Sequence, residues 1–314
     1  MSRTSLTDQI VDLRRAHTGE NLTQAVAAVR PLVRYLSADQ RVMLTDTVRG
    51  GSAVPDGLRR ALLPDATFVA QQELEAGLLR AACDTASYLH LRPPAAPAHA
   101  FRTVEPHDWP HLHVAERALG PLLYELLPRV EVGQLVGLPG LRHRRHPRAV
   151  ELYLADAPDA RALLSGVDAA AWDEAMRYVR GLHDFRGLDT RLIGDEPLVG
   201  LERESSRAVG PAALGSALLR RVHLFAGASW LRSWAQGDQW WLEWPGEPRQ
   251  VTVADRLIHP VFGLPGHFET SIGAETISLV GQATLSLRGV LAPAAEVQER
   301  LKDFDWPAEF NSGS

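Results

Sequence analysis

A proline-rich segment divides the chain into two regions with different hydrophobic periods. Residues 92–98 read RPPAAPA, and three prolines in seven residues cannot continue a helix, because proline lacks a backbone N–H. Before this segment apolar residues recur with the period of helices, whereas after it several stretches alternate like strands. We therefore expect a helical domain over 1–92, a stiff Pro-rich linker over 93–98, and a body over 99–310 that is either undivided or split into subdomains 99–184 and 211–310.

Short polar signals predict where the N-terminal helices begin and end. Gly19 is expected to end a helix over residues 5–17, since glycine readily adopts the positive φ of a tight corner. Asp65 is expected to cap the longest helix of this region. The three-residue spacing of a capping box, in which two side chains bond each other's backbone N–H, occurs in the pairs Asn21–Gln24 and Ser37–Gln40.

Beyond the linker, alternation of apolar and polar residues predicts two hairpins, one over 101–106 and 111–116 and one over 149–156 and 160–166. Further strands are expected over 239–244, 249–255, 275–280 and 283–290. Helices are expected over 117–130, 169–182, 211–235 and 294–304. Because strands and helices follow one another without a regular βαβ rhythm, the body should be a mixed, mostly antiparallel α+β structure.

Lysine is almost absent, since Lys302 is the only lysine among 33 basic residues. Walker-A loops, protein-kinase cores and pyridoxal-phosphate Schiff bases all require a lysine in a specific setting, so these classes are excluded. The sequence also lacks the Gly-rich dinucleotide turn and the G-x-S-x-G nucleophile elbow. The preference for arginine, which has GC-rich codons, predicts an actinobacterial source.

The composition is that of a soluble globular protein. Hydrophobic residues make up 45% of the chain and the formal net charge is −5, which argues against general polyanion binding. The single cysteine, Cys83, rules out both an internal disulfide and a cysteine-based zinc finger. No signal peptide and no apolar run long enough to span a bilayer is evident, so we expect a cytoplasmic protein without membrane contact.

The stretch EPHDWPHLHVAE, residues 105–116, contains the best candidate metal ligands. On a strand, His111 and His113 would point to the same face, and His107 or Glu116 could complete a zinc or other divalent-metal site with an open position for water. This pattern supports a metal-dependent hydrolase. The alternative is a polar surface hairpin with no cofactor, which is the interpretation we favour.

The stretch LRHRRHPR, residues 141–148, is the most basic part of the chain. An extended segment carrying these arginines could lie along nucleic-acid phosphates, together with the helical N-terminus. Alternatively, the arginines keep an exposed strand edge soluble. The candidate phosphate-binding residues are Arg142, Arg144, Arg145 and Arg148.

Five of the eight tryptophans fall between residues 230 and 244. Trp230 and Trp234 would share a helical face, whereas Trp240 and Trp244 would share one face of a strand and Trp241 the other. Such residues either pack in a core or form interface and stacking anchors. Combined with a small helical domain that needs a docking partner for stability, they favour a non-catalytic interaction protein, regulatory or part of an assembly, that self-associates or binds another protein.

Overall fold

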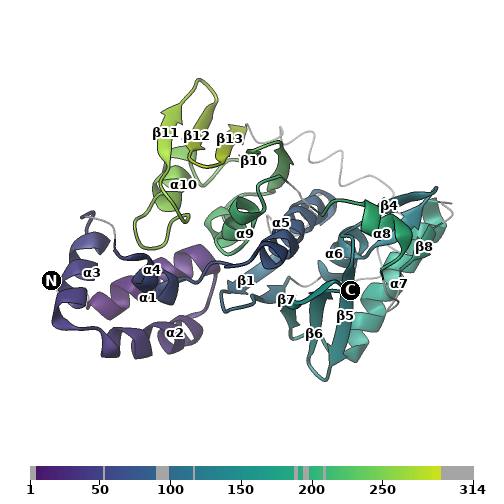
Figure 1. Ribbon diagram of the computed structural model, residues 1–314, viewed down its shortest axis with the longest axis horizontal. Helices are drawn as coiled ribbons and strands as arrows, with labels where there is room; N and C mark the ends of the chain where they lie inside the picture. Colours follow the sequence, from purple (N-terminus) through teal and green to yellow (C-terminus); the bar gives the residue numbers. More distant parts are fainter. Residues whose placement is uncertain are drawn as a thin grey trace.

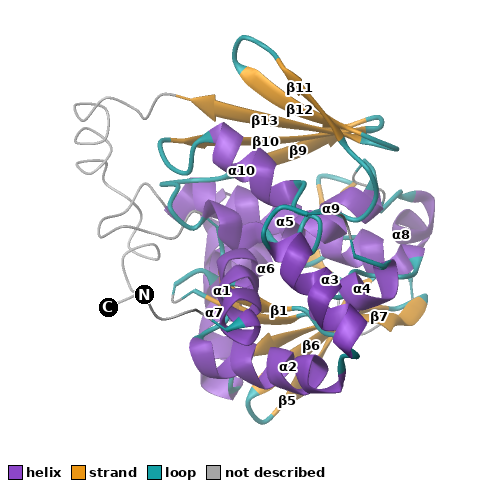
Figure 2. Ribbon diagram, turned by 90° about the vertical axis from the view of Figure 1, so that its left-hand side faces the viewer, coloured by secondary structure: helices purple, strands orange, loops and turns teal. Residues whose placement is uncertain are grey.

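The structure of the protein is a computed structural model that describes residues 5–51, 54–89, 99–115, 117–186, 190–193, 198–207 and 210–290. Two five-stranded sheets lie on opposite sides of a central group of helices, and further helices extend the molecule at its N-terminal end (Figures 1 and 2). The predicted α+β fold is therefore confirmed. The expected linker over 93–98 and the expected helix over 294–304 lie outside the described residues.

The N-terminal helices begin where the polar signals predicted. Both expected capping boxes, Asn21–Gln24 and Ser37–Gln40, are formed in full, and Gly19 ends the first helix with a φ of 74°. The helices of this region are α1 (Leu6–Thr18), α2 (Leu22–Tyr35), α3 (Ala38–Val48) and α4 (Asp56–Leu62).

Helix α5 (Val69–Leu89) runs through the centre of the molecule and packs against a first sheet, in which both predicted hairpins are confirmed. The strand order is β1-β2-β7-β6-β5, and only β2 and β7 run parallel. Alternate residues, such as Val104 and Leu112, face the core. The strands are β1 (Phe101–Glu105), β2 (His111–Val114), β5 (Leu141–His146), β6 (Ala149–Leu154) and β7 (Ala157–Ser165).

A second sheet forms a separate layer above the helices in Figure 2. Its strand order is β11-β12-β13-β10-β9, so β9 and β11 are the edge strands. One face buries Trp240, Leu242 and Trp244, and the other carries Trp241 and Glu243, which are half-buried. The strands are β9 (Arg232–Gln236), β10 (Gln239–Pro245), β11 (Glu269–Ile272), β12 (Thr276–Val280) and β13 (Thr284–Val290).

Two sequence predictions in this region are wrong. The single helix expected over 211–235 is instead α9 (Ala212–Leu219), the 3₁₀ helix η1 (Val222–Phe225) and strand β9; the apolar stretch changes conformation where β9 pairs with β10. The strand expected over 249–255 is the helix α10 (Gln250–Leu257), which buries Val253, Ala254 and Leu257 with helical spacing. Tertiary packing therefore overrides the local alternation of valines.

A small third sheet has the strand order β4-β3-β8. The helix expected over 117–130 ends at Leu126, because the residue before Pro128 is disfavoured in a helix, and the chain continues into β3. The remaining elements are α6 (Leu119–Leu126), β3 (Arg129–Glu131), β4 (Gln134–Val136), α7 (Ala169–Arg186), β8 (Thr190–Leu192) and α8 (Gly200–Glu204).

The buried apolar residues form two clusters. The larger cluster joins α5 to the two large sheets and to α6, α7 and α9. The smaller cluster is built from α1 to α4 together with Val261 and Phe262, which lie between α10 and β11. The first four helices thus share a core with two residues that follow α10, about 200 positions later in the chain.

Arg220 is a buried charge at the junction of these parts. Its guanidinium forms two hydrogen bonds with the carboxylate of Glu75 on α5, of 2.5 and 2.7 Å, and both side chains are fully buried. The remaining nitrogen, Nη1, donates to the carbonyl oxygens of Pro64 and His107. One side chain therefore connects α5, the loop before it and the turn between β1 and β2.

The adjacent Arg221 makes a second buried connection. It donates to the carboxylate of Asp65 at 2.7 Å and to the carbonyl of Phe262. Burial raises the pKa of Asp65, but Arg221 and Arg59 outweigh this effect and hold that pKa below its usual value. Asp65 is therefore not the helix cap expected from the sequence, since α5 begins only at Val69.

Removing one partner of the Arg220–Glu75 pair should destabilise the protein strongly. In Glu75→Leu the buried guanidinium loses its carboxylate, and we expect the free energy of unfolding to fall by about 3–5 kcal/mol. The double variant Glu75→Leu/Arg220→Met removes both charges and should lose less than the single variant. Urea denaturation followed by circular dichroism measures this difference.

The exposed pair of Arg249 and Glu247 provides the control for this measurement. Arg249→Leu should change the free energy of unfolding by less than about 1 kcal/mol. Equal stability of Glu75→Leu and the unmodified protein would contradict the importance of the buried pair.

His17 makes stability depend on pH. It is buried at the end of α1 and stacks on Phe262, with ring centroids 5.6 Å apart. Burial lowers its pKa to about 4, against 6.5 for an unperturbed histidine. Between these values the unfolded chain binds a proton that the folded protein does not, so the free energy of unfolding should fall as the pH decreases from about 6.5 to 4.

In His17→Gln this contribution is absent, and the fall in unfolding free energy over that pH range should be shallower by up to about 1.4 kcal/mol per pH unit. Urea denaturation at several pH values gives the slopes, with His146→Gln, at the exposed end of β5, as the control. Identical slopes in all three proteins would rule out a contribution from His17.

Candidate functional sites

The hairpin of β1 and β2 presents polar side chains on the face opposite the core. Its register pairs Glu105 with His111 across the strands, and Thr103 with His113. Since alternate residues of a strand point to opposite faces, Glu105, His111 and His113 share one face. The predicted proximity of His111 and His113 follows from the same alternation.

Glu105 is the centre of this cluster. Its Oε1 lies 2.5 Å from His113 Nε2 and accepts a hydrogen bond of 2.7 Å from Gln24 on α2. Its Oε2 lies 3.7 Å from Nε2 of His107 in the turn. Within the described ranges, Glu105, His107 and His111 are the one group of three side chains whose potential ligand atoms all lie within 4.8 Å of one another.

The ligand set therefore differs in part from the one expected from the sequence. His107 and His111 belong to it, His113 contacts the carboxylate instead, and Glu116 lies outside the described residues. Glu105 is not among the ligands predicted from the sequence, although it begins the same stretch. Cross-strand pairing with His111 would have identified it, had the length of the intervening turn been known.

The charges in this cluster are set by its own contacts. The neighbouring imidazoles of His107 and His113 hold the pKa of Glu105 well below its usual value, although partial burial opposes this shift. Partial burial and the neighbouring His107 lower the pKa of His111. At neutral pH the cluster therefore presents a carboxylate beside a neutral imidazole, and both forms are metal ligands.

The four arginines of residues 141–148 do not form one surface. Arg142 is buried and bonded by two nitrogens to Glu202 of α8. Arg144 pairs with Glu151 on the same face of the sheet, and Arg145 pairs with Asp173 of α7 on the other face. Arg148 is exposed in the turn between β5 and β6.

Trp240 and Trp244 are fully buried, and their indole N–H groups donate to Ser233 and to the carbonyl of Pro248. Trp241 is half-buried on the outer face of the same sheet. It stacks on Trp234 of β9, with ring centroids 5.7 Å apart and an interplanar angle of 1°. Trp234 therefore lies on a strand, and the helical face predicted for Trp230 and Trp234 does not exist.

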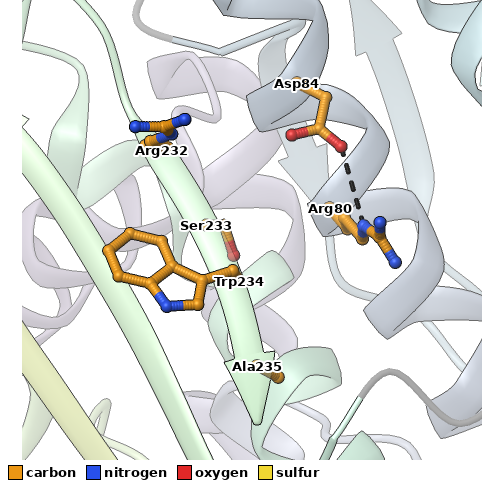
Figure 3. A pocket seen from close by; sticks show the side chains of 6 residues that line it. All are labelled: Arg80, Asp84, Arg232, Ser233, Trp234 and Ala235. Atoms are coloured by element: carbon orange, nitrogen blue, oxygen red, sulfur yellow. Dashed lines mark ion pairs between the residues drawn. The ribbon is translucent and has the colours of Figure 1, made fainter.

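A groove runs between the edge strand β9 and helix α5 (Figure 3). It has a volume of about 480 Å³ and is lined by four consecutive strand residues, 232–235, and by Arg80 and Asp84 of the helix. The sequence does not reveal this groove, because residues 232–235 belong to the stretch that its pattern predicts to be helical. Long-range pairing with β10 is the information that was missing.

The groove is polar and carries excess positive charge. The Oδ2 atom of Asp84 lies 3.6 Å from Nε of Arg80. Burial raises the pKa of Asp84, and the positive charges of Arg80 and Arg232 oppose this shift. Arg232 is exposed, and no ion pair joins it to a described carboxylate. Along the described chain, the backbone of β9 pairs with β10 alone, so its second edge faces the groove.

Comparison with known proteins adds no family to this description. No protein-family model matches the chain, and neither a curated protein nor a solved structure matches it. Among the described helices, none combines the length and the apolar character needed to cross a membrane. What the histidine cluster and the β9 groove can do is therefore inferred from their own residues alone.

Proposed function

We propose that the protein is a non-catalytic interaction protein that binds an extended segment of a partner protein along the edge of β9. The observation that carries this proposal is the lining of the groove, to which four consecutive residues of an edge strand and two charged residues of α5 contribute. An edge strand offers a row of backbone N–H and C=O groups, and an extended peptide can pair with them as an additional strand.

The side chains beside the edge supply specificity. Residues of an added strand point alternately to the two faces of the sheet. On the outer face they would meet Arg232 and the half-buried indole of Trp234, which is stacked on Trp241. On the inner face they would meet Arg80 and Asp84. Backbone pairing thus provides affinity, and these side chains determine which residues the partner can carry at alternate positions of its added strand.

The charge of the groove favours an acidic segment. Two arginines face a single aspartate that is already paired with one of them, so Arg232 is available to a carboxylate of the partner. A partner protein with acidic residues therefore fits this groove best, in a regulatory or assembly role.

Binding of defined peptides to the full-length protein tests this proposal. The probes are peptides of alternating valine and glutamate, the same peptides with lysine for glutamate, and glutamate peptides N-methylated at alternate backbone positions. We expect the glutamate peptide to bind at least ten times more tightly than the lysine peptide, because its glutamates, which share one face of the added strand, would lie beside Arg232. N-methylation should abolish binding, because it removes the strand hydrogen bonds. Fluorescence anisotropy measures these affinities.

Charge reversal provides the matched variants. Arg232→Glu should weaken binding of the glutamate peptide and improve that of the lysine peptide, whereas Arg177→Glu, at an exposed position on α7, should change neither. Retained binding of the N-methylated peptide, or equal binding of both charge types, would contradict strand addition at β9.

A further inference from the structure

The geometry of the β1–β2 turn points to a further site: we infer that Glu105, His107 and His111 bind one divalent transition-metal ion of the zinc class. This inference is independent of the proposed peptide groove. Two imidazoles and one carboxylate form a common protein ligand set for zinc and for iron(II), whereas magnesium and calcium prefer oxygen ligands alone. The remaining coordination positions would be filled by water.

The three donor groups need only small movements to bind an ion. Their ligand atoms already lie within 4.8 Å of one another. Ligands at about 2.0–2.2 Å from zinc in a tetrahedral arrangement are separated by roughly 3.3 Å, so the distances between the ligand atoms must shorten by at most about 1.5 Å. His107 is half exposed in the turn, and its side chain has the freedom to make this movement.

Neighbouring residues hold the carboxylate in a suitable orientation. His113 and Gln24 both bond to Oε1 of Glu105, which leaves Oε2 directed at His107. Gln24 is itself fixed, because its Oε1 accepts the backbone N–H of Asn21 in the capping box. Such outer contacts orient the ligands in metal sites generally. His113 is therefore a positioning residue.

The turn that carries His107 is also anchored. Its carbonyl oxygen accepts a hydrogen bond of 2.8 Å from the buried Arg220. A fixed backbone lowers the entropy that must be lost when the side chains close on an ion.

Trp109 provides a direct signal of occupancy. Its indole N–H donates to Nε2 of His111 at 3.2 Å. This hydrogen bond occupies the lone pair that a metal would use, so binding of an ion through Nε2 breaks the bond and changes the surroundings of the Trp109 indole. Metal binding should therefore change the fluorescence of Trp109.

Titration of the untagged, chelator-treated full-length protein with Zn²⁺, and separately with Co²⁺, tests the inference. We expect saturable binding of one ion per chain by calorimetry, visible absorption bands of protein-bound Co²⁺, and a change in tryptophan fluorescence. His107→Ala and His111→Ala should each weaken binding at least tenfold, and His113→Ala should weaken it by 10–100-fold as an outer contact. Circular dichroism confirms that each variant is folded.

Two controls separate this site from adventitious binding. His146→Ala removes a half-exposed histidine near Glu151 and should leave the affinity unchanged. Trp109→Phe should retain the metal and lose the fluorescence change. Absence of saturable binding, or unchanged affinity in the His107→Ala/His111→Ala double variant, would overturn the inference. Peptide binding at β9 should persist in chelator, which distinguishes the two sites.

Discussion

The bidentate bond between Arg220 and Glu75 is the interaction on which the arrangement of the other elements depends. Two charges without access to water are tolerable only when they are paired and their remaining hydrogen-bonding groups are satisfied. Arg220 meets this condition by using carbonyl groups from two distant loops. The need to satisfy one guanidinium thus fixes where the β1–β2 turn and the loop before α5 must lie.

Arg221 extends the same constraint to the segment after α10 and, through it, to the N-terminal helices. It fixes Asp65 and the carbonyl of Phe262, and the side chain of Phe262 packs in the cluster of the first four helices and against His17. The consecutive residues Arg220 and Arg221 therefore hold the N-terminal helices, α5 and the segment after α10 next to one another. Both candidate sites are built on these elements, since α5 lines the β9 groove and the β1–β2 turn carries the histidine cluster.

Local features could be read from the sequence because they depend on neighbouring residues. The capping boxes, the corner at Gly19 and the two hairpins are set within a few positions, and the predictions for them are confirmed. The helix expected over 211–235 failed because its composition is compatible with a helix and only pairing with β10 selects a strand. Likewise, a buried Arg220 is indistinguishable in sequence from a surface arginine in a chain that has 32 of them.

The same holds for the candidate sites: the sequence predicts the contacts between near neighbours and misses the contacts between distant residues. Alternation placed His111 and His113 on one face, but the contribution of Glu105 requires the cross-strand register, and that of Gln24 requires the position of α2. The β9 groove combines residues from positions 80 to 235. No short sequence pattern indicates that residues this far apart along the chain lie side by side.

Hydrogen exchange of the Arg220→Lys variant, followed by mass spectrometry, tests the central role of this arginine most directly. Lysine keeps the charge but cannot form the bidentate bond and both carbonyl contacts together. The account predicts faster exchange in α5, in residues 63–66 and in residues 105–111, with the strands β12 and β13 unaffected. Faster exchange confined to α9 and η1 would contradict it, because Arg220 would then stabilise only its own segment.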